Sequence, residues 1–207
     1  MDFQPIYKNT DQINSDAESF LDNYHHSMSI PVPIEEIIDL QLQIDIVPIP
    51  GLKDTFEKAG LDIDAFISSD FKSITVDKYV QEKVNTRYRF TLAHEIGHRF
   101  LHGYLYTQFK FNTIDGWIDT INNMPLYEIE VVEGQANEFA GLVLVPRRIL
   151  KDEFKKALKE SEELCQVSYA EKPEIVRGLA ILILAGKFKV SEDVIRIRLE
   201  RDGLKKR

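Results

Sequence analysis

The feature that most constrains the fold is the segment 88–103, YRFTLAHEIGHRFLHG, which contains three of the five histidines in the chain. His94 and His98 are four positions apart and Glu95 follows the first, which is the HExxH spacing. Positions four apart on an α-helix lie on one face, so both imidazoles can bind the same metal ion. Zinc accepts neutral imidazole nitrogen, and Glu95 is placed to act as a general base. The segment predicts a metal-binding helix.

The alternative is an ordinary amphipathic helix whose histidines bind nothing. Gly97 leaves space for another segment to approach closely, and Gly103 is expected to end the helix. His102 is expected to be a residue of the last turn, favoured there by the helix dipole, rather than a ligand. An apolar stripe at helical spacing supports the helix in either case: Phe90, Ala93, Gly97, Phe100 and Leu101.

A catalytic zinc site needs a third protein ligand, which we expect on a downstream helix. The segment 126–145, between two prolines, has helical spacing and supplies several acids. Glu133 and Asn137 share one face, so one can bind the ion while the other hydrogen-bonds a ligand histidine. Glu130 competes with Glu133 for the ligand position. Glu138 lies roughly 100° around the helix from Asn137 and is expected to face solvent.

Composition excludes several classes of protein. The net charge is −8, from 26 basic and 34 acidic residues, which argues against a dedicated nucleic-acid binder. A single cysteine allows no intramolecular disulfide and suits a reducing compartment. The start of the chain lacks the pattern of a signal peptide, and the longest apolar run, 178–186, is too short for a membrane span. We therefore expect a cytoplasmic protein with no membrane partner.

The order of elements is typical of an α+β fold. A helix from about residue 30 is followed by β-like runs at 43–51, 64–69 and 72–77, the last two expected to be neighbouring strands. After the HExxH helix, residues 104–124 show little periodicity, and the rest is helical. We expect residues 1–30 to be an appendage, with a short helix near 16–27, and residues 31–205 to form the main domain.

Two blocks together resemble a known family. RFTLAHEIGHRFLH (89–102), followed by EGQANEFAGLVLVP (133–146), resembles the ImmA/IrrE family of metallopeptidases, which shows an RxxLAHELGH-like segment and then ExxANxFAxxLLMP. LVLVP stands where LLMP is usual, a change between apolar residues. The tail 179–204 and the SITVD strand (73–77) also look like the family's segments.

The resemblance implies a zincin-like fold, with a small twisted sheet over the HExxH helix and a mostly helical C-terminal half. It implies His94 and His98 as Zn²⁺ ligands, Glu95 as the catalytic base and Glu133 as the third ligand. Asn137 then takes the place of an acidic residue that contacts a ligand histidine in related enzymes. The implied activity is zinc-dependent endopeptidase cleavage of a protein partner, a helix-turn-helix repressor of phage or mobile-element type.

Two other functions remain open on sequence alone. The chain could be a non-cleaving interaction module or a toxin-like partner of a cognate regulator, although such a module need not retain Glu95. A DNA-binding regulator would use the last helix, 191–202, but the acids on that helix favour a structural role. The donor that would stabilise an oxyanion is not assigned, and proximity in sequence suggests four residues: His102, Tyr104, Tyr106 and Tyr127.

Overall fold

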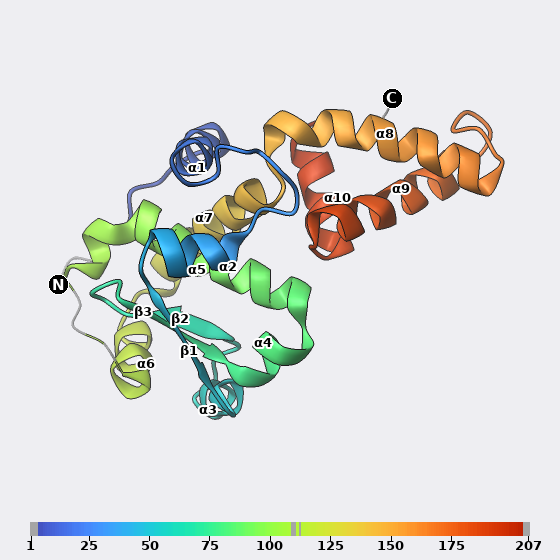
Figure 1. Ribbon diagram of the computed structural model, residues 1–207. Coiled ribbons are helices and arrows are strands. Elements are labelled where there is room, and N and C mark those ends of the chain that lie inside the picture. Colours follow the sequence, from blue (N-terminus) through green and yellow to red (C-terminus); the bar gives the residue numbers. More distant parts are fainter. Residues whose placement is uncertain (1–3, 109–110, 112, 205–207) are drawn as a thin grey trace.

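The computed structural model describes residues 4–108, 111 and 113–204 of the chain (Figure 1). Three short strands form one sheet in the order β1-β3-β2. β1 (Asp45–Ile49) pairs parallel to the central strand β3 (Ser73–Asp77), and β2 (Ala65–Ile67) pairs antiparallel to β3 at the other edge. The prediction that the second and third β-like runs are neighbouring strands is confirmed. Two short helices, α3 (Leu52–Lys58) and α4 (Lys78–Lys83), contact the sheet.

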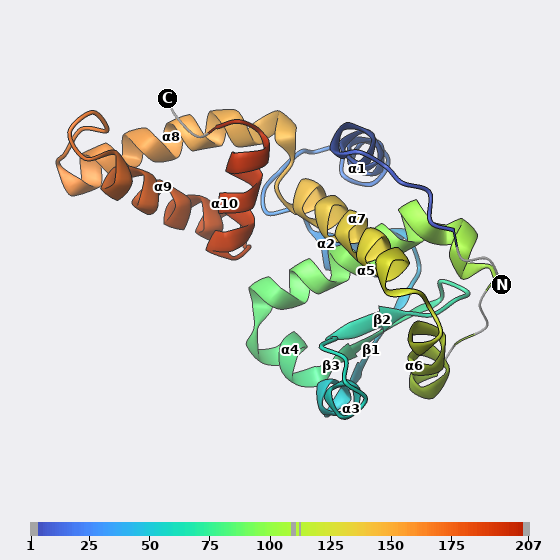
Figure 2. The same cartoon turned by 180° about the vertical axis from the view of Figure 1, so that it is seen from behind.

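The HExxH segment lies in α5 (Asn85–Tyr106), which packs between β2 and the helix α7 (Leu126–Leu144). Figures 1 and 2 show α5 and α7 side by side above the sheet. The close approach expected at Gly97 is present, because a Cβ added there would lie 3.2 Å from both the Cα and the carbonyl oxygen of Ala136. The predicted end at Gly103 is wrong. The helix continues to Tyr106, where Leu105 is buried and Tyr106 packs against the hydrophobic core.

The N-terminal helix α1 (Thr10–Tyr24) starts with a capping box, in which the Asn9 side chain and Gln12 satisfy each other's backbone N–H groups. Its apolar face is buried, and the Phe20 ring lies edge-on to Phe139 of α7 with 5.8 Å between centroids. This helix therefore contributes to the main core, although it lies in the segment expected to be an appendage. A domain boundary at residue 30 stays a prediction. The next helix, α2 (Ile34–Glu36), continues into a π-helical turn, η1 (Ile37–Gln41).

Residues 104–124 are more regular than expected, because they contain the helix α6 (Ile114–Asn122). The Thr113 hydroxyl caps it by accepting a hydrogen bond from the Gly116 N–H. Trp117 is buried against Phe56 of α3, with 5.3 Å between ring centroids, and forms a second small hydrophobic cluster. Residues 109, 110 and 112 lie outside the described part of the chain.

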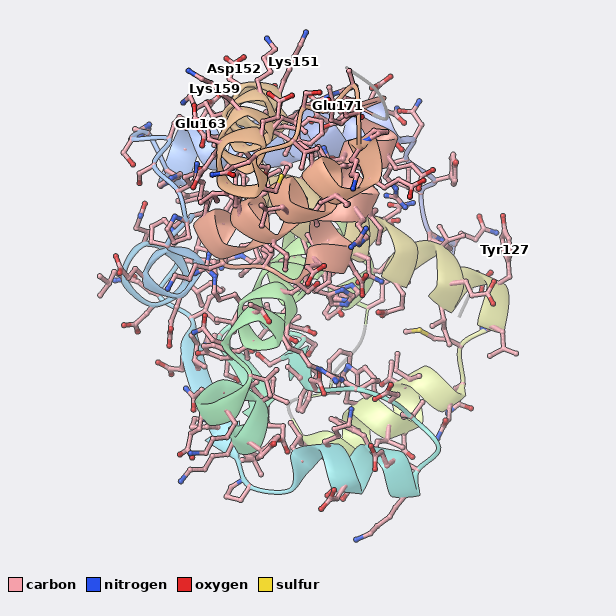
Figure 3. The ribbon with its side chains drawn as sticks, turned by 90° about the vertical axis from the view of Figure 1, so that its right-hand side faces the viewer. Tyr127, Lys151, Asp152, Lys159, Glu163 and Glu171 are labelled. Atoms are coloured by element: carbon pink, nitrogen blue, oxygen red, sulfur yellow. The ribbon has the colours of Figure 1, made fainter. Side chains whose placement is uncertain are left out.

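The last three helices, α8 (Arg147–Cys165), α9 (Pro173–Phe188) and α10 (Glu192–Arg201), pack on one another at one end of the molecule (Figures 1 and 2). They confirm the predicted helical C-terminal half. α8 is amphipathic, and its outer side is charged, as the labelled side chains show in Figure 3: Lys151, Asp152, Lys159 and Glu163. Among the described residues, no helix has the length and apolar character needed to cross a bilayer.

The expectation that Glu138 faces solvent is wrong. Only 4% of its side chain is exposed, and its carboxylate accepts a hydrogen bond from Arg198 Nη1 of α10 at 3.2 Å. Arg201 pairs with the same carboxylate, and Arg198 Nη2 also pairs with Asp202. The pairs of Glu138 with Arg198 and Arg201 join α7 to α10, which explains why the helix face at Glu138 is covered.

Candidate metal centre

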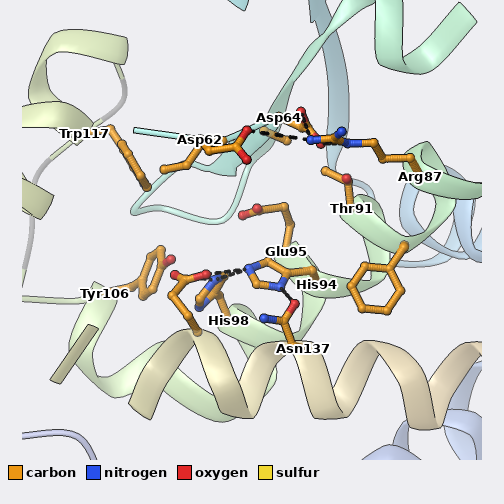
Figure 4. A pocket seen from close by; sticks show the side chains of 14 residues that line it. Asp62, Asp64, Arg87, Thr91, His94, Glu95, His98, Tyr106, Trp117 and Asn137 are labelled. Atoms are coloured by element: carbon orange, nitrogen blue, oxygen red, sulfur yellow. Dashed lines mark hydrogen bonds and ion pairs between the residues drawn. The ribbon is translucent and has the colours of Figure 1, made fainter. Parts of the chain in front are cut away.

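Two helices bring together the five site residues singled out from the sequence. α5 supplies His94, Glu95 and His98, and α7 supplies Glu133 and Asn137 (Figure 4). The Nε2 atoms of the two histidines are 2.9 Å apart. Glu133 Oε2 lies 3.1 Å from His94 Nε2, and Glu133 Oε1 lies 3.4 Å from His98 Nε2. Both imidazoles therefore point toward one carboxylate.

Glu130, the competing acid, lies elsewhere. Its side chain is exposed and borders a different cavity, beside Tyr7 and Lys8 of the N-terminal segment. Of the two acids left open by the sequence pattern, the structure places Glu133 at the histidines.

The donor set fits a divalent metal ion. Two imidazole nitrogens and a carboxylate are the ligands of one class of catalytic zinc site. Burial alone lowers the pKa of His94, but the hydrogen bond and negative charge of Glu133 outweigh it and raise that pKa to about 9. Burial also acts to raise the pKa of Glu133, yet the two histidines hold it well below its usual range. The carboxylate thus attracts positive charge to the point that the ring nitrogens face, and a metal cation would supply that charge.

Asn137 contacts the outer nitrogen of His94, which is the Nδ1 atom that faces away from Glu133. Its Oδ1 atom lies 3.0 Å from His94 Nδ1. An amide oxygen only accepts hydrogen bonds, so Nδ1–H of His94 donates, and Nε2 is left as the ring atom that faces Glu133. This is the arrangement expected of a residue that orients a metal ligand.

Glu95 is buried at the floor of the same cleft. Its Oε2 atom accepts a hydrogen bond of 2.8 Å from the backbone N–H of Ile67 in β2. Burial raises the pKa of Glu95, and the nearby histidines only partly oppose this effect. One donor atom from each of His94, Glu95 and His98 lies within 4.8 Å of the others. Glu95 is therefore close enough to act on a water molecule at the metal position.

The cleft above these residues has a volume of about 280 Å³. The wall of the cleft opposite the histidines contains Asp64, just before β2, which pairs with Arg87 of α5 (Figure 4). The sequence pattern did not predict these two residues. Trp117 of α6 closes one side. Among the tyrosines suggested for an oxyanion donor, Tyr106 lines this cleft, whereas Tyr127 is 73% exposed and points into solvent (Figure 3). Tyr106 is half-buried, and its desolvation raises its pKa well above the usual range and keeps its hydroxyl protonated.

His102 was expected to lie in the last turn of the helix, and this prediction is wrong because α5 continues to Tyr106. The side chain is fully buried between α5 and α7. His102 Nδ1 lies 3.3 Å from His98 Nδ1, and His102 Nε2 lies 3.3 Å from Gln135 Oε1. Burial lowers the pKa of His102 to about 3. The repeated spacing of four between the three histidines already placed them on one face, which is the signal that could have identified it.

Residues 55–200 match the sequence profile of the Peptidase_M78 family, the IrrE N-terminal-like domain. The chain belongs to this family of peptidases. The match covers well over half of the chain and includes the whole of α5 and α7, and with them all five site residues. It confirms the resemblance to ImmA/IrrE metallopeptidases. No curated protein has a sequence that matches this chain.

Proposed function

We propose that this M78 peptidase is a zinc-dependent endopeptidase that cleaves one protein partner, a helix-turn-helix repressor of phage or mobile-element type. One observation carries the proposal. His94 and His98 of α5 and Glu133 of α7 direct their donor atoms to one point, and Glu95 lies beside it. The combination of ligand histidines with an adjacent buried carboxylate has a direct use in hydrolysis, whereas a binding module has no need of it.

In this mechanism, His94, His98 and Glu133 would hold a divalent ion, and Asn137 orients His94. A bound divalent ion would polarise the scissile carbonyl and lower the pKa of the attacking water. Glu95 removes a proton from that water, and the raised pKa of Glu95 matches this task because it brings the carboxyl closer to neutral pH. The same carboxyl group then passes the proton to the leaving amine. The hydroxyl of Tyr106 is the candidate donor to the developing oxyanion, since it lines the cleft beside Glu95.

The sheet supports a peptide substrate. β2 is an edge strand, paired with β3 on one side, and Ala65 of β2 lines the cleft. An extended peptide can add to such an edge through main-chain hydrogen bonds. A cleft with a strand edge on one wall and the histidines below thus suits an unfolded segment of a protein chain.

The repressor as substrate rests on the family resemblance and on charge. DNA-binding repressors carry basic surfaces for phosphate contacts. The net charge of −8 on this chain favours association with such a partner and disfavours direct binding to nucleic acid.

Metal content of the purified chain tests the site. We expect one zinc per chain in the wild type and in Glu130→Ala, and none in Glu133→Ala. Zinc-free wild-type protein after incubation with zinc would refute the proposal and favour the non-cleaving interaction module.

Cleavage is tested separately with Glu95→Gln, which keeps the ligands but cannot accept a proton. Labelling of new protein N-termini in a host lysate should reveal one or few cut proteins with the wild type, including a DNA-binding repressor, and none with Glu95→Gln. Equal cutting by Glu95→Gln would remove Glu95 from the mechanism, and many unrelated cuts would refute narrow specificity.

A further inference from the structure

The two ligand histidines are oriented in different ways. The outer nitrogen of His94 contacts an amide oxygen directly, at Asn137 Oδ1. The outer nitrogen of His98 instead contacts another imidazole, at His102 Nδ1, which can either donate or accept. The state of His98 therefore depends on what His102 contacts on its other side.

A backbone carbonyl decides the direction of these hydrogen bonds. Gln135 Nε2 lies 3.1 Å from the carbonyl oxygen of Ile6, which can only accept, so the amide nitrogen of Gln135 must face it. The amide oxygen of Gln135 then faces His102 Nε2 at 3.3 Å, and His102 donates there. The backbone N–H of Ile6 is itself bonded to the Tyr104 hydroxyl, which fixes the position of this segment on α5.

The protonation state of His102 follows from its surroundings. It is fully buried, and its two ring nitrogens face His98 and the amide oxygen of Gln135. A buried cation without an adjacent counter-ion is costly, so His102 is neutral and carries one proton. With that proton on Nε2, His102 Nδ1 is an acceptor and His98 Nδ1–H must donate to it. The lone pair of His98 is then on Nε2, the atom that faces Glu133.

We infer that His102 and Gln135 are positioning residues that fix the tautomer of His98 for metal binding, in a hydrogen-bond relay that starts at the Ile6 carbonyl. This inference rests on the proposed metal site. His102 itself is not a ligand, because it contacts the Nδ1 side of His98, while the metal position lies on the Nε2 side. The relay also makes the N-terminal segment a part of the site, although it is far from α5 and α7 in sequence.

The test is the zinc affinity of the full-length chain, measured by competition with a chromogenic chelator at one pH and ionic strength. His102→Phe keeps a planar aromatic ring but removes the acceptor, and Gln135→Leu removes the group that orients His102. We expect both to bind zinc about 10- to 100-fold more weakly, the range for residues that support metal ligands. His102→Asn should retain most of the affinity, because its amide oxygen can accept from His98 Nδ1.

A matched control separates this effect from a loss of stability. His25 is also buried and bonded, with Nε2 2.8 Å from the Ser29 carbonyl, but it has no contact with the site. We expect His25→Phe to leave the zinc affinity unchanged. Circular dichroism and melting of the metal-free proteins show which variants fold. If His102→Phe does not fold, the zinc affinity of Gln135→Leu provides the test.

Nitrogen-15 NMR gives a readout that a purely structural role would not change. In wild type, neutral His98 should carry its proton on Nδ1, and in His102→Phe the two tautomers should mix. Folded His102→Phe and Gln135→Leu proteins with wild-type zinc affinity would overturn the inference and leave the metal site intact. A wild-type chain that binds no zinc would instead overturn the proposed function, and the tautomer of His98 would still test the relay.

Discussion

Substitution of three acids on α7 by alanine should affect stability and zinc binding in three different ways. Glu138→Ala should lower the free energy of unfolding by about 3 kcal/mol and leave zinc binding intact. Glu133→Ala should abolish zinc binding without a comparable loss of stability in the metal-free chain. Glu130→Ala, the matched control on the same helix, should change stability by no more than about 0.5 kcal/mol, because it is exposed.

The loss of stability expected for Glu138→Ala follows from its ion-pair partner, Arg198. Arg198 has 2% of its side chain exposed, and removal of Glu138 takes away the acceptor of its Nη1 group. Breaking a buried ion pair costs about 3–5 kcal/mol, since a charge remains buried without its partner. Arg198 keeps Asp202, at 3.0 and 3.1 Å from Nη2, so we expect the lower end of that range. Arg201 is half exposed and can turn toward water, so the loss of its pair adds little.

Urea unfolding of the metal-free proteins, followed by circular dichroism, measures the stability, and elemental analysis measures the zinc. Glu138→Gln keeps a hydrogen-bond acceptor and should lose less stability than Glu138→Ala. A loss below about 1 kcal/mol for Glu138→Ala would show that water reaches Arg198, which would refute the burial argument. Zinc lost from Glu138→Ala and retained by Glu133→Ala would refute the assignment of the site.

Further changes test the packing around the site. Gly97→Ala places a Cβ 3.2 Å from the backbone of Ala136, so we expect a loss of about 1–3 kcal/mol in urea unfolding and weaker zinc binding in the chelator competition. Asn137→Ala should weaken zinc at least about 10-fold in that competition with little change in melting temperature, because the side chain is exposed. Trp117→Ala leaves a cavity in the second hydrophobic cluster. We expect the free energy of opening of α6, measured by hydrogen exchange, to fall by about 3 kcal/mol. Removal of zinc from wild-type protein held at 100 times the dissociation constant should cost about 2.7 kcal/mol of stability, and Glu133→Ala should show no such change.

Spacing within one helix predicted the parts of the site that depend on one helix. His94 and His98 share a face of α5, and Glu133 and Asn137 share a face of α7, because four residues make slightly more than one turn. Both pairs lie where this rule places them. Only the structure assigns separate roles to Glu133 and Asn137. Periodicity does not say which of the two side chains lies at the Nε2 atoms of the histidines and which lies at His94 Nδ1.

Features that depend on a distant partner were not predictable in this way. Glu138 has the spacing of a solvent-exposed acid on α7, and it is covered by α10, which places Arg198, sixty residues later, against its carboxylate. His102 has the same kind of ambiguity, because its burial depends on the contact between α5 and α7 and on Gln135. The helix α6 was missed because its apolar side is short and is completed by Phe56 of α3. Tertiary packing decided each of these cases.

The crossing of α5 and α7 gives a physical reason why the site depends on helix packing. Ala136 contacts α5 at Gly97, and its two chain neighbours, Gln135 and Asn137, contact the two histidine systems on either side. A displacement of α7 at this crossing therefore changes the Asn137–His94 and Gln135–His102 hydrogen bonds together. It also moves the Glu133 carboxylate relative to the two ligand histidines. It follows that Gly97→Ala, which alters no ligand and no hydrogen-bonding group, should weaken zinc binding more than Asn137→Ala, which removes one of the two outer bonds. Stability loss in Gly97→Ala with unchanged zinc affinity would show instead that the ligands adjust independently of the helix contact.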